Sequence, residues 1–560
     1  MNAEAAARRK PKAKKRKVKQ KPRCTVARKH KVKAKKARPK ARRSSGYAFE
    51  APEERLDAVS AAKRKRRKRS LAKRKPKRKL CAPRKKRKRA PAPHATPPPP
   101  AVPAPAPPGI SSPISVYSGP FGRAEAERLL WRAGFGPSPG WSEAFSSFGL
   151  EASVNSLVYP QAAETFVGAE PVDGNGVPIA PEDLWGHDHV FWLDRMVRTD
   201  QPLVQRLALI WHDWFATSND GVGNTRFMLD QYELFRAIGR GSFGELVRRV
   251  TIDPAMMIWL NATENRKGAI NENYGRELME LFTLGADRGA YTETDVRQLA
   301  RSLSGWRVDW VEGIGYTNFR WDAKRWDNGQ KTVFGQTGAF AWEDAYRMCL
   351  AHPLHPSFFV NKLWSYFIPT PPPEGDRQAL EQYYVDVGYE VAPVVRAILL
   401  HPDLYQGPRM VKPPVVFNAG LLRALARPID RTDWSWLSEG AGQTLFYPPD
   451  VAGWDDNRWL DTSTTRGRWD MVRYALDEHY VQWSVMGAYG STETPDEAVN
   501  RALATWAQPE VTPETRSSLL GFASSCLPAV MNKNQQNTYR AQRQNALLQL
   551  IASSPDLQTS

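Results

Sequence analysis

The sequence has few cysteines, four in 560 residues. Cys24 and Cys81 lie in a basic N-terminal stretch, and Cys349 and Cys526 lie far apart in the rest of the chain. Because no CxxC pair occurs, both a disulfide framework and a thiolate metal site are excluded as working hypotheses. A reducing compartment is the simpler expectation.

Long apolar runs are also missing. No stretch approaches the 18 or more apolar residues of a membrane span, and the first 100 residues hold no apolar core of a secretory signal. The sequence therefore predicts no membrane span and a cytoplasmic location, with association with the nucleoid included. Export or a place in the cell envelope stays open as the alternative.

Acidic residues are scarce at the N-terminus. Residues 1–100 hold 41 of the 81 Lys and Arg but five of the 58 Asp and Glu, which leaves 40 basic and 53 acidic residues for the remainder. Chains of this charge with so little apolar surface do not fold alone. We expect a disordered basic tail over 1–89, a Pro/Ala-rich linker over 90–120, and mobility throughout 1–108.

A tail of this charge binds polyanions through release of counterions. The Lys/Arg runs lack interleaved aromatic residues, so residues 8–89 are expected to bind nucleic acid without reading its sequence. Two alternatives remain. The tail binds an anionic cell-wall polymer or lipid, or the start codon has been assigned too far upstream.

The rest of the chain reads as mainly α-helical. Amphipathic segments recur from about Phe121 onwards, and strand signals are nearly confined to residues 306–335, where Gly and Asp-Asn-Gly turns separate aromatic and β-branched residues. We predict a large multi-helix domain with one small β-hairpin insertion over 121–485. Residues 486–560 are expected to form C-terminal helices that pack on it.

Several strings in the body resemble a known family. They include "AERLLWRAGFGPSP", "IWHDWFATS", "NYGRELMELFTLG", "FVNKLWSYFI" and "PPDVAGW", in order between about Arg123 and Tyr480, and the ending "IASSPDLQ". The chain resembles the bacterial domain-of-unknown-function family 1800. That resemblance implies no reaction, and many members look exported. Trp214 and Trp326 stand where the family pattern resembles histidine, so we expect the two to lie near one another, where relatives have a metal or acid–base centre.

The stretch "GAINENYGRELMELFTLGAD" predicts a helix from Asn271 to Leu284. Asn271 is the expected N-cap and Gly285 the expected left-handed residue after the end. Tyr274, Leu278, Leu281 and Phe282 share the apolar side. The polar side is open to two interpretations: a solvated face with i,i+4 ion pairs, or one side of a functional site.

The loop before this helix favours the functional interpretation. Amide and basic side chains gather above the helix N-terminus, where anions and polar ligands bind. With 20 tryptophans in the chain, a carbohydrate ligand fits such a cleft. The expected binding residues are Asn261, Asn265, Arg266, Lys267, Asn271, Glu272, Arg276 and His212.

Two residues on the helix are candidates for chemistry. Glu277 and Glu280 project together at i,i+3 and suit an acid–base pair. His187, Asp188, His189 and His212 are of metal-binding types, but their spacing matches no ligand signature, so no metal is assigned and the cofactor stays unknown.

Two functional classes follow. The first is a binding protein with a polyanion-binding tail and a polar ligand cleft over 261–280. The alternative is an enzyme or binding protein for cell-envelope polysaccharide, with Glu277 and Glu280 as acid and base. The functional interpretation further predicts that Arg276 and Glu277 are largely buried and hydrogen-bonded to the loop or to His212.

Overall fold

The structure is a computed structural model that describes residues 96–100, 111–477, 479–481 and 493–560. The chain divides into two units, Met1–Arg87 and Lys88–Ser560, and the described residues all belong to the second. The predicted basic tail, its mobility and most of the linker therefore lie outside the described residues.

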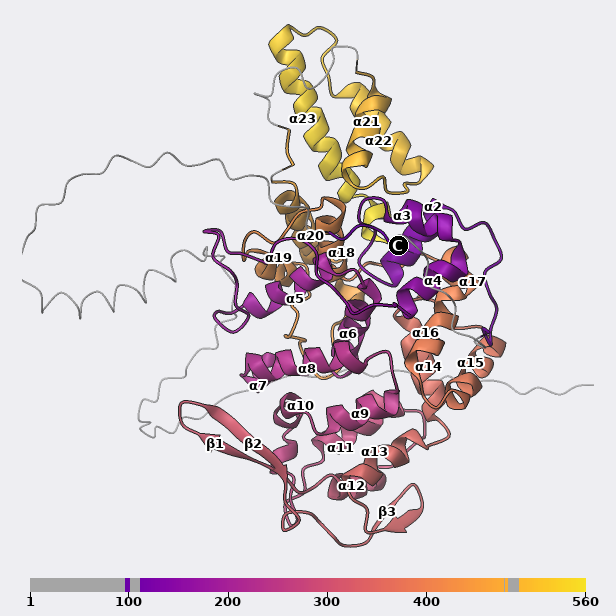
Figure 1. The fold of residues 1–560 in the computed structure, drawn as a ribbon, viewed down its shortest axis with the longest axis vertical. Coiled ribbons are helices and arrows are strands. Elements are labelled where there is room, and N and C mark those ends of the chain that lie inside the picture. The colour runs from indigo at the N-terminus through magenta and orange to yellow at the C-terminus, as the bar shows by residue number, and fades with distance from the viewer. Residues whose placement is uncertain (1–95, 101–110, 478, 482–492) are drawn as a thin grey trace, which may run out of the picture. The chain divides into compact units, whose positions relative to one another are not determined.

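Three short helices near the start of this unit pack in sequence: α2 (Arg123–Arg132), α3 (Trp141–Phe148) and α4 (Leu150–Val158). Glu125 Oε2 accepts a hydrogen bond from Gly122 N at 2.9 Å and so satisfies a free N–H at the start of α2. Trp141 opens α3, stacks on Phe145 at 5.5 Å and is buried. These three helices form the indigo region of Figure 1.

The next helices form the centre of the unit. α6 is buried along almost its whole length because apolar side chains occupy every side of it, with Asp213 as the exception. It packs on α5 and α8. The bounds are α5 (His187–Arg198), α6 (Pro202–Trp214), α7 (Asn219–Val222), α8 (Thr225–Ile238), α9 (Phe243–Thr251) and α10 (Pro254–Trp259).

Short helices and strands then alternate in the lower part of Figure 1. A 3₁₀ turn, an α-helix that continues as a π-helix, two more helices and two strand pairs make up this region. They are η1 (Ala262–Glu264), α11 (Asn273–Glu277), η2 (Leu278–Thr283), α12 (Glu293–Ser302), β1 (Trp306–Val311), β2 (Gly315–Trp321), β3 (Lys331–Val333), β4 (Gln336–Gly338) and α13 (Trp342–Leu350).

Helices continue to the C-terminus. The last long ones, α21 to α23, pack on one another and form the yellow group of Figure 1, with α23 also contacting α20. The bounds are α14 (His355–Ser365), α15 (Glu374–Asp386), α16 (Val391–Leu400), α17 (Pro402–Gln406), α18 (Pro414–Ala424), α19 (Trp434–Gly440), η3 (Asp456–Arg458), α20 (Thr462–Ala475), α21 (Pro495–Thr505), α22 (Pro513–Ser525), α23 (Lys533–Ala552) and α24 (Pro555–Gln558).

The β1–β2 hairpin has one apolar and one polar face because of a bulge. Trp306 and Trp310 lie four residues apart on the same face of β1, whereas their antiparallel partners, Trp321 and Tyr316, are five apart on β2. Such partners would point to opposite faces in a regular strand. The register shifts by one residue between them, next to Asn318, whose φ is 55°. All four aromatic residues therefore share one face.

The prediction of a mainly helical fold with a small hairpin is confirmed, and a second short pair, β3–β4, follows the hairpin. Several of the tryptophans are core residues: Trp141, Trp192, Trp211, Trp214, Trp364 and Trp434 are fully buried. No helix in the described part of the chain combines the length and apolarity needed to cross a membrane. The predicted division at residues 485 and 486 stays a prediction.

Candidate functional site

The predicted helix exists but is not a regular α-helix. α11 covers Asn273–Glu277 and η2 continues as a π-helix to Thr283. Gly285 has φ 87°, as predicted for the residue after the end. Asn271 lies one residue before the N-cap, and its Oδ1 accepts from Asn273 N at 3.0 Å. Sequence periodicity did not predict the wider turn, a form that recurs at functional sites.

The C-terminal end of this helix is saturated by side chains from elsewhere in the chain. Four consecutive carbonyl groups, which a helix end leaves without helical partners, each accept a hydrogen bond. Three of the donors come from other helices and one from the following loop. The pairs are Lys362 Nζ to Leu281 O at 3.0 Å, Trp214 Nε1 to Phe282 O at 3.1 Å, His355 Nδ1 to Thr283 O at 2.8 Å and Arg288 Nη1 to Leu284 O at 2.8 Å.

Trp214 therefore has a structural role, and the prediction that it lies beside Trp326 is wrong. The Trp214 ring packs on Phe359 at 5.7 Å and lies 4.6 Å from Lys362 Nζ. Trp326 instead packs on Trp321 at 5.7 Å, beside the hairpin. Their ring contacts do not overlap within the described residues, so the two departures from the family pattern do not mark one shared centre.

His212 is also absent from the predicted site. It is buried between Trp192, at 5.4 Å, and Trp454, at 5.4 Å, and its Nε2 accepts from Phe446 N at 3.1 Å. Burial lowers the pKa of His212 to about 3, so the imidazole is neutral and acts as an acceptor for the backbone. The structure does not bring His212 to the lining of the predicted site, because helical spacing does not show which face of α6 meets which loop.

The neighbouring Asp213 anchors the 448–455 loop. Its Oδ2 accepts from Tyr366 Oη at 2.6 Å and its Oδ1 from Trp454 N at 3.0 Å. A Cβ at Gly453, where φ is 91°, would lie 2.3 Å from Asp213 Oδ1, so the backbone approaches the carboxylate as closely as only glycine permits. Three segments that carry the family resemblance thus meet at a structural junction.

The loop before the helix is held rigid by Asn265. This buried side chain donates to Ala300 O at 2.8 Å and accepts from Asn271 N at 3.2 Å, while Gly305 N donates to its backbone carbonyl at 3.2 Å. Asn261 turns the chain with φ 55°. Because Asn265 is buried and both its amide nitrogen and its oxygen bond within the protein, it positions the loop.

An open depression lies where the sequence predicted a site. Its volume is about 620 Å³, and both charged and amide side chains line it. Arg266 and Asn271 were predicted; Glu264 and Asn273 were not among the predicted binding residues. The lining residues are Glu264, Arg266, Ala269, Ile270, Asn271 and Asn273.

Three other predicted binding residues have partners elsewhere. Lys267 Nζ donates to Asn328 Oδ1 at 2.7 Å. Arg276 forms a two-pronged ion pair with Glu293 at 2.7 and 2.8 Å and a longer contact of 3.5 Å with Glu272. Of the 261–273 loop, Glu272 thus contacts Arg276, at 3.5 Å. The shorter bonds go to Glu293, because α12 packs beside α11 and supplies a carboxylate that helical periodicity cannot reveal.

Glu277 is partly buried and has no hydrogen-bond partner among the described residues. The prediction that Glu277 is hydrogen-bonded to the loop or to His212 is therefore wrong. Burial, followed by the neighbouring Glu280 carboxylate, raises the pKa of Glu277 to about 7, and Arg276 opposes the shift. Asn273 lies four residues earlier, one turn away on the same side of the helix. Glu277 therefore lies one helical turn beyond Asn273, which lines the depression, and is not itself a lining residue.

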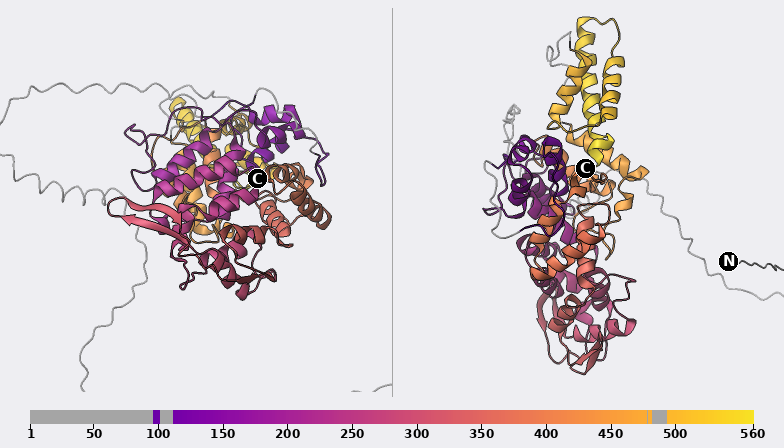
Figure 2. Two further views of the ribbon diagram at one scale, coloured as in Figure 1. Left: turned by 60° about the horizontal axis from the view of Figure 1, so that its bottom comes forward. Right: turned by 90° about the vertical axis from the view of Figure 1, so that its right-hand side faces the viewer.

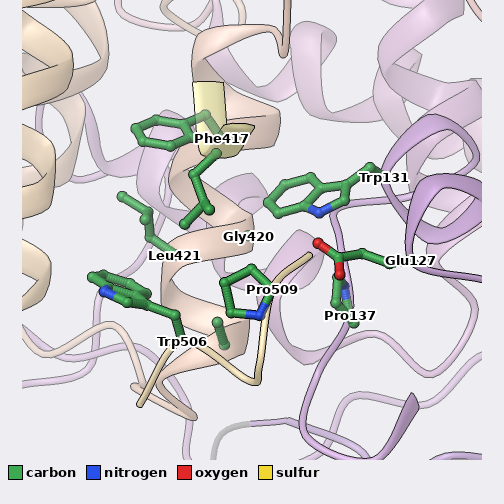
Figure 3. A pocket seen from close by; sticks show the side chains of 10 residues that line it. Glu127, Trp131, Pro137, Phe417, Gly420, Leu421, Trp506 and Pro509 are labelled. Carbon is green, nitrogen blue, oxygen red and sulfur yellow. The ribbon is translucent and has the colours of Figure 1, made fainter. Parts of the chain in front are cut away.

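A second cavity between α2, α18 and the C-terminal region is small and mostly apolar (Figure 3). Its volume of about 20 Å³ accommodates a single water molecule. Glu127, at its edge, accepts from Glu510 N at 3.0 Å. Trp131 covers another side and lies 3.6 Å from Lys412 Nζ. This cavity is a packing feature and has no room for a ligand.

The described residues form a mainly helical protein with an open polar depression at the start of a π-containing helix. Residues 128–559 match the family described as "Protein of unknown function (DUF1800)", and the chain belongs to this family. The match also includes the helices between Tyr480 and the C-terminal string "IASSPDLQ", which carried no resemblance of their own. No curated protein and no solved structure matches the chain.

Proposed function

We propose that the depression at residues 264–273 binds a small polar ligand of the carbohydrate class. The observation that carries this proposal is the lining: a guanidinium, a carboxylate and two amides face one open hollow. Sugar hydroxyl groups both donate and accept hydrogen bonds, and this set of side chains offers both. Apart from His212, the residues predicted from sequence lie in this loop–helix segment.

The rigidity of the loop supports binding. The Asn265 side chain bonds the loop to Ala300 O, and Arg325 Nη2 donates to Thr263 O at 2.7 Å. A loop held in this way loses little conformational freedom when a ligand arrives. The depression is thus a preformed site.

Titration of the full chain with N,N′-diacetylchitobiose, followed by calorimetry or NMR, tests the proposal. Binding should weaken by at least about five-fold in Arg266→Ala and Asn271→Ala, because each removes a lining side chain. Arg297→Ala is the matched control, since Arg297 is an exposed arginine of α12 outside the lining. Lack of binding by the wild type, or equal binding by all variants, would refute the site.

A second candidate function is hydrolysis of such a glycan. The observation that favours it is Glu277, a carboxyl group without a hydrogen-bond partner in the described residues and with a pKa of about 7, which suits a general acid near neutral pH. Release of reducing ends from chitohexaose should disappear in Glu277→Gln and decline above about pH 7. The same assay on Glu280→Gln tests whether Glu280 acts as the second carboxylate of the predicted acid–base pair.

For the N-terminal tail, the proposal rests on charge alone. Residues 8–89 are proposed to bind nucleic acid or another polyanion in the cytoplasm, and cell fractionation checks the location. Affinity for two unrelated duplexes should be equal and should fall steeply with salt. A preference for one duplex would contradict it. Brief trypsin treatment should leave a stable fragment that starts near residues 112–123.

A further inference from the structure

The outer half of the β1–β2 hairpin presents apolar side chains to solvent. Trp310 is 67% exposed and Ile314, in the turn, 70%. Tyr316 lies opposite Trp310, edge to face at 4.9 Å. Figures 1 and 2 both show the hairpin extending away from the helices. Large exposed apolar side chains gathered in this way mark a binding surface.

The inner half of the same face is anchored. Trp306 packs on Trp342 at 5.7 Å, and Phe319 packs on Phe227 of α8 at 5.5 Å. Trp321 packs on Trp326 at 5.7 Å. The hairpin therefore stands on a fixed base, and the exposure of its outer half does not arise from poor packing of the whole element.

The base of the hairpin is joined to the loop that lines the depression. Gly305 N, just before β1, donates to Asn265 O at 3.2 Å. After β2, Arg325 O accepts from Lys267 N at 2.7 Å, and the Arg325 side chain binds Thr263 O. The depression and the hairpin thus belong to one continuous piece of structure.

On the polar face of the hairpin, the charged side chains of the two strands pair with acidic or basic neighbours. Asp309 accepts from Arg320 at 2.7 and 3.0 Å and from Asn318 at 2.8 Å, so its carboxylate and the Arg320 guanidinium are already paired. Nucleic acid binds through unpaired cations beside aromatic rings, whereas both arginines of the described β1 and β2 strands, Arg307 and Arg320, have carboxylate partners. A standard protein interface needs about 800 Å² from each partner, whereas the exposed apolar side chains here are chiefly Trp310 and Ile314. One sugar ring needs only one aromatic face.

We infer that the hairpin extends the depression into a longer binding surface for a neutral, hydroxyl-rich glycan chain, with one end of the chain in the depression and sugar rings stacked on Trp310 further along. The inference rests on the proposed function of the depression. Trp310 lies four residues along β1 from Trp306 at its base, about 13 Å at roughly 3.3 Å per residue. A disaccharide in the depression therefore leaves Trp310 untouched, and a chain of several sugars reaches it.

The test compares N,N′-diacetylchitobiose with chitohexaose on the full chain. In the wild type the hexamer should bind at least about five-fold more tightly than the dimer. Trp310→Ala should remove this difference and leave binding of the dimer unchanged. Trp469→Ala is the matched control, because Trp469 is a similarly exposed tryptophan, at 45%, on α20.

Each outcome has one meaning. Equal binding of dimer and hexamer, or a hexamer affinity that survives Trp310→Ala, overturns the inference and leaves the depression intact as a site. If neither glycan binds, the proposed function fails and the inference with it. A shift from dimer to monomer in Trp310→Ala, seen by sedimentation, would assign the tip to a second copy of the chain and overturn the inference as well.

Discussion

The two ends of the α11–η2 helix differ in how their polar groups are used. At the C-terminal end, Lys362, Trp214, His355 and Arg288 saturate four consecutive carbonyls. At the N-terminal end, the side chains of Arg266 and Asn271 line an open hollow. The same helix is thus closed at one end and open at the other.

This difference separates structural from binding residues. A polar group that already has a buried partner holds the fold together, because breaking that contact leaves its partner unsatisfied. A polar group that faces solvent in a hollow is free to meet a ligand. Perturbation at the closed end should therefore change stability, and perturbation at the open end should change binding.

The largest effect is expected at the closed end. Trp214→Ala removes a fully buried indole and the donor to Phe282 O, and should lower the free energy of unfolding by about 3–5 kcal/mol. Chemical denaturation measures it. The exposed Trp310→Ala should change stability by less than about 0.5 kcal/mol. Similar values for the two would contradict a structural role for Trp214.

Glu277 should make stability depend on pH. Its folded pKa of about 7 lies above the ordinary 4.5, so an unfolded chain releases this proton first as the pH rises. The contribution of Glu277 to the free energy of unfolding is therefore fully present below about pH 4.5 and is lost as the pH rises to about 7. The loss is roughly 1–3 kcal/mol after allowance for partial exposure. Glu277→Gln should flatten this decline. Parallel pH curves for variant and wild type would show that Glu277 is not perturbed.

Asn265→Ala should lower both the stability of the protein and its affinity for the sugar. It leaves Ala300 O and Asn271 N without their partner and should destabilise the protein by about 1–3 kcal/mol. The loop that lines the depression loosens as well, so sugar binding should weaken. Asn328→Ala, at an exposed site with one contact to Lys267, is the control. Full retention of binding in Asn265→Ala would mean that the loop does not need this anchor.

The smallest effect is expected at Arg276. Its ion pair with Glu293 is partly exposed, so Arg276→Ala should lower stability by about 0.2–1 kcal/mol, and salt should reduce the difference. Arg226→Ala, which removes the exposed pair with Asp230, serves for comparison. A decrease of several kcal/mol in the free energy of unfolding of Arg276→Ala would contradict this and would support the buried hydrogen-bond network predicted from the sequence.

Local sequence patterns predicted the helix, the glycine that ends it, the hairpin and the position of the open hollow. These features depend on residues close together in the chain. The partners at the closed end could not be predicted, since Trp214 and Lys362 lie 68 and 81 residues from the carbonyls they bind. The main partner of Arg276 could not be predicted for the same reason. The pattern indicated polar neighbours on its own helix, but Glu293 lies on the next one.

The bulge beside Asn318 has a consequence for how this protein changes during evolution. Because the extra residue sets which side each later β2 residue faces, loss of one residue there would turn Phe319 and Trp321 away from their contacts and detach the hairpin from its base. Substitutions at Trp310 or Ile314 disturb no such contact. These contacts therefore constrain the length of the hairpin, whereas they place no constraint on the side chains at its tip.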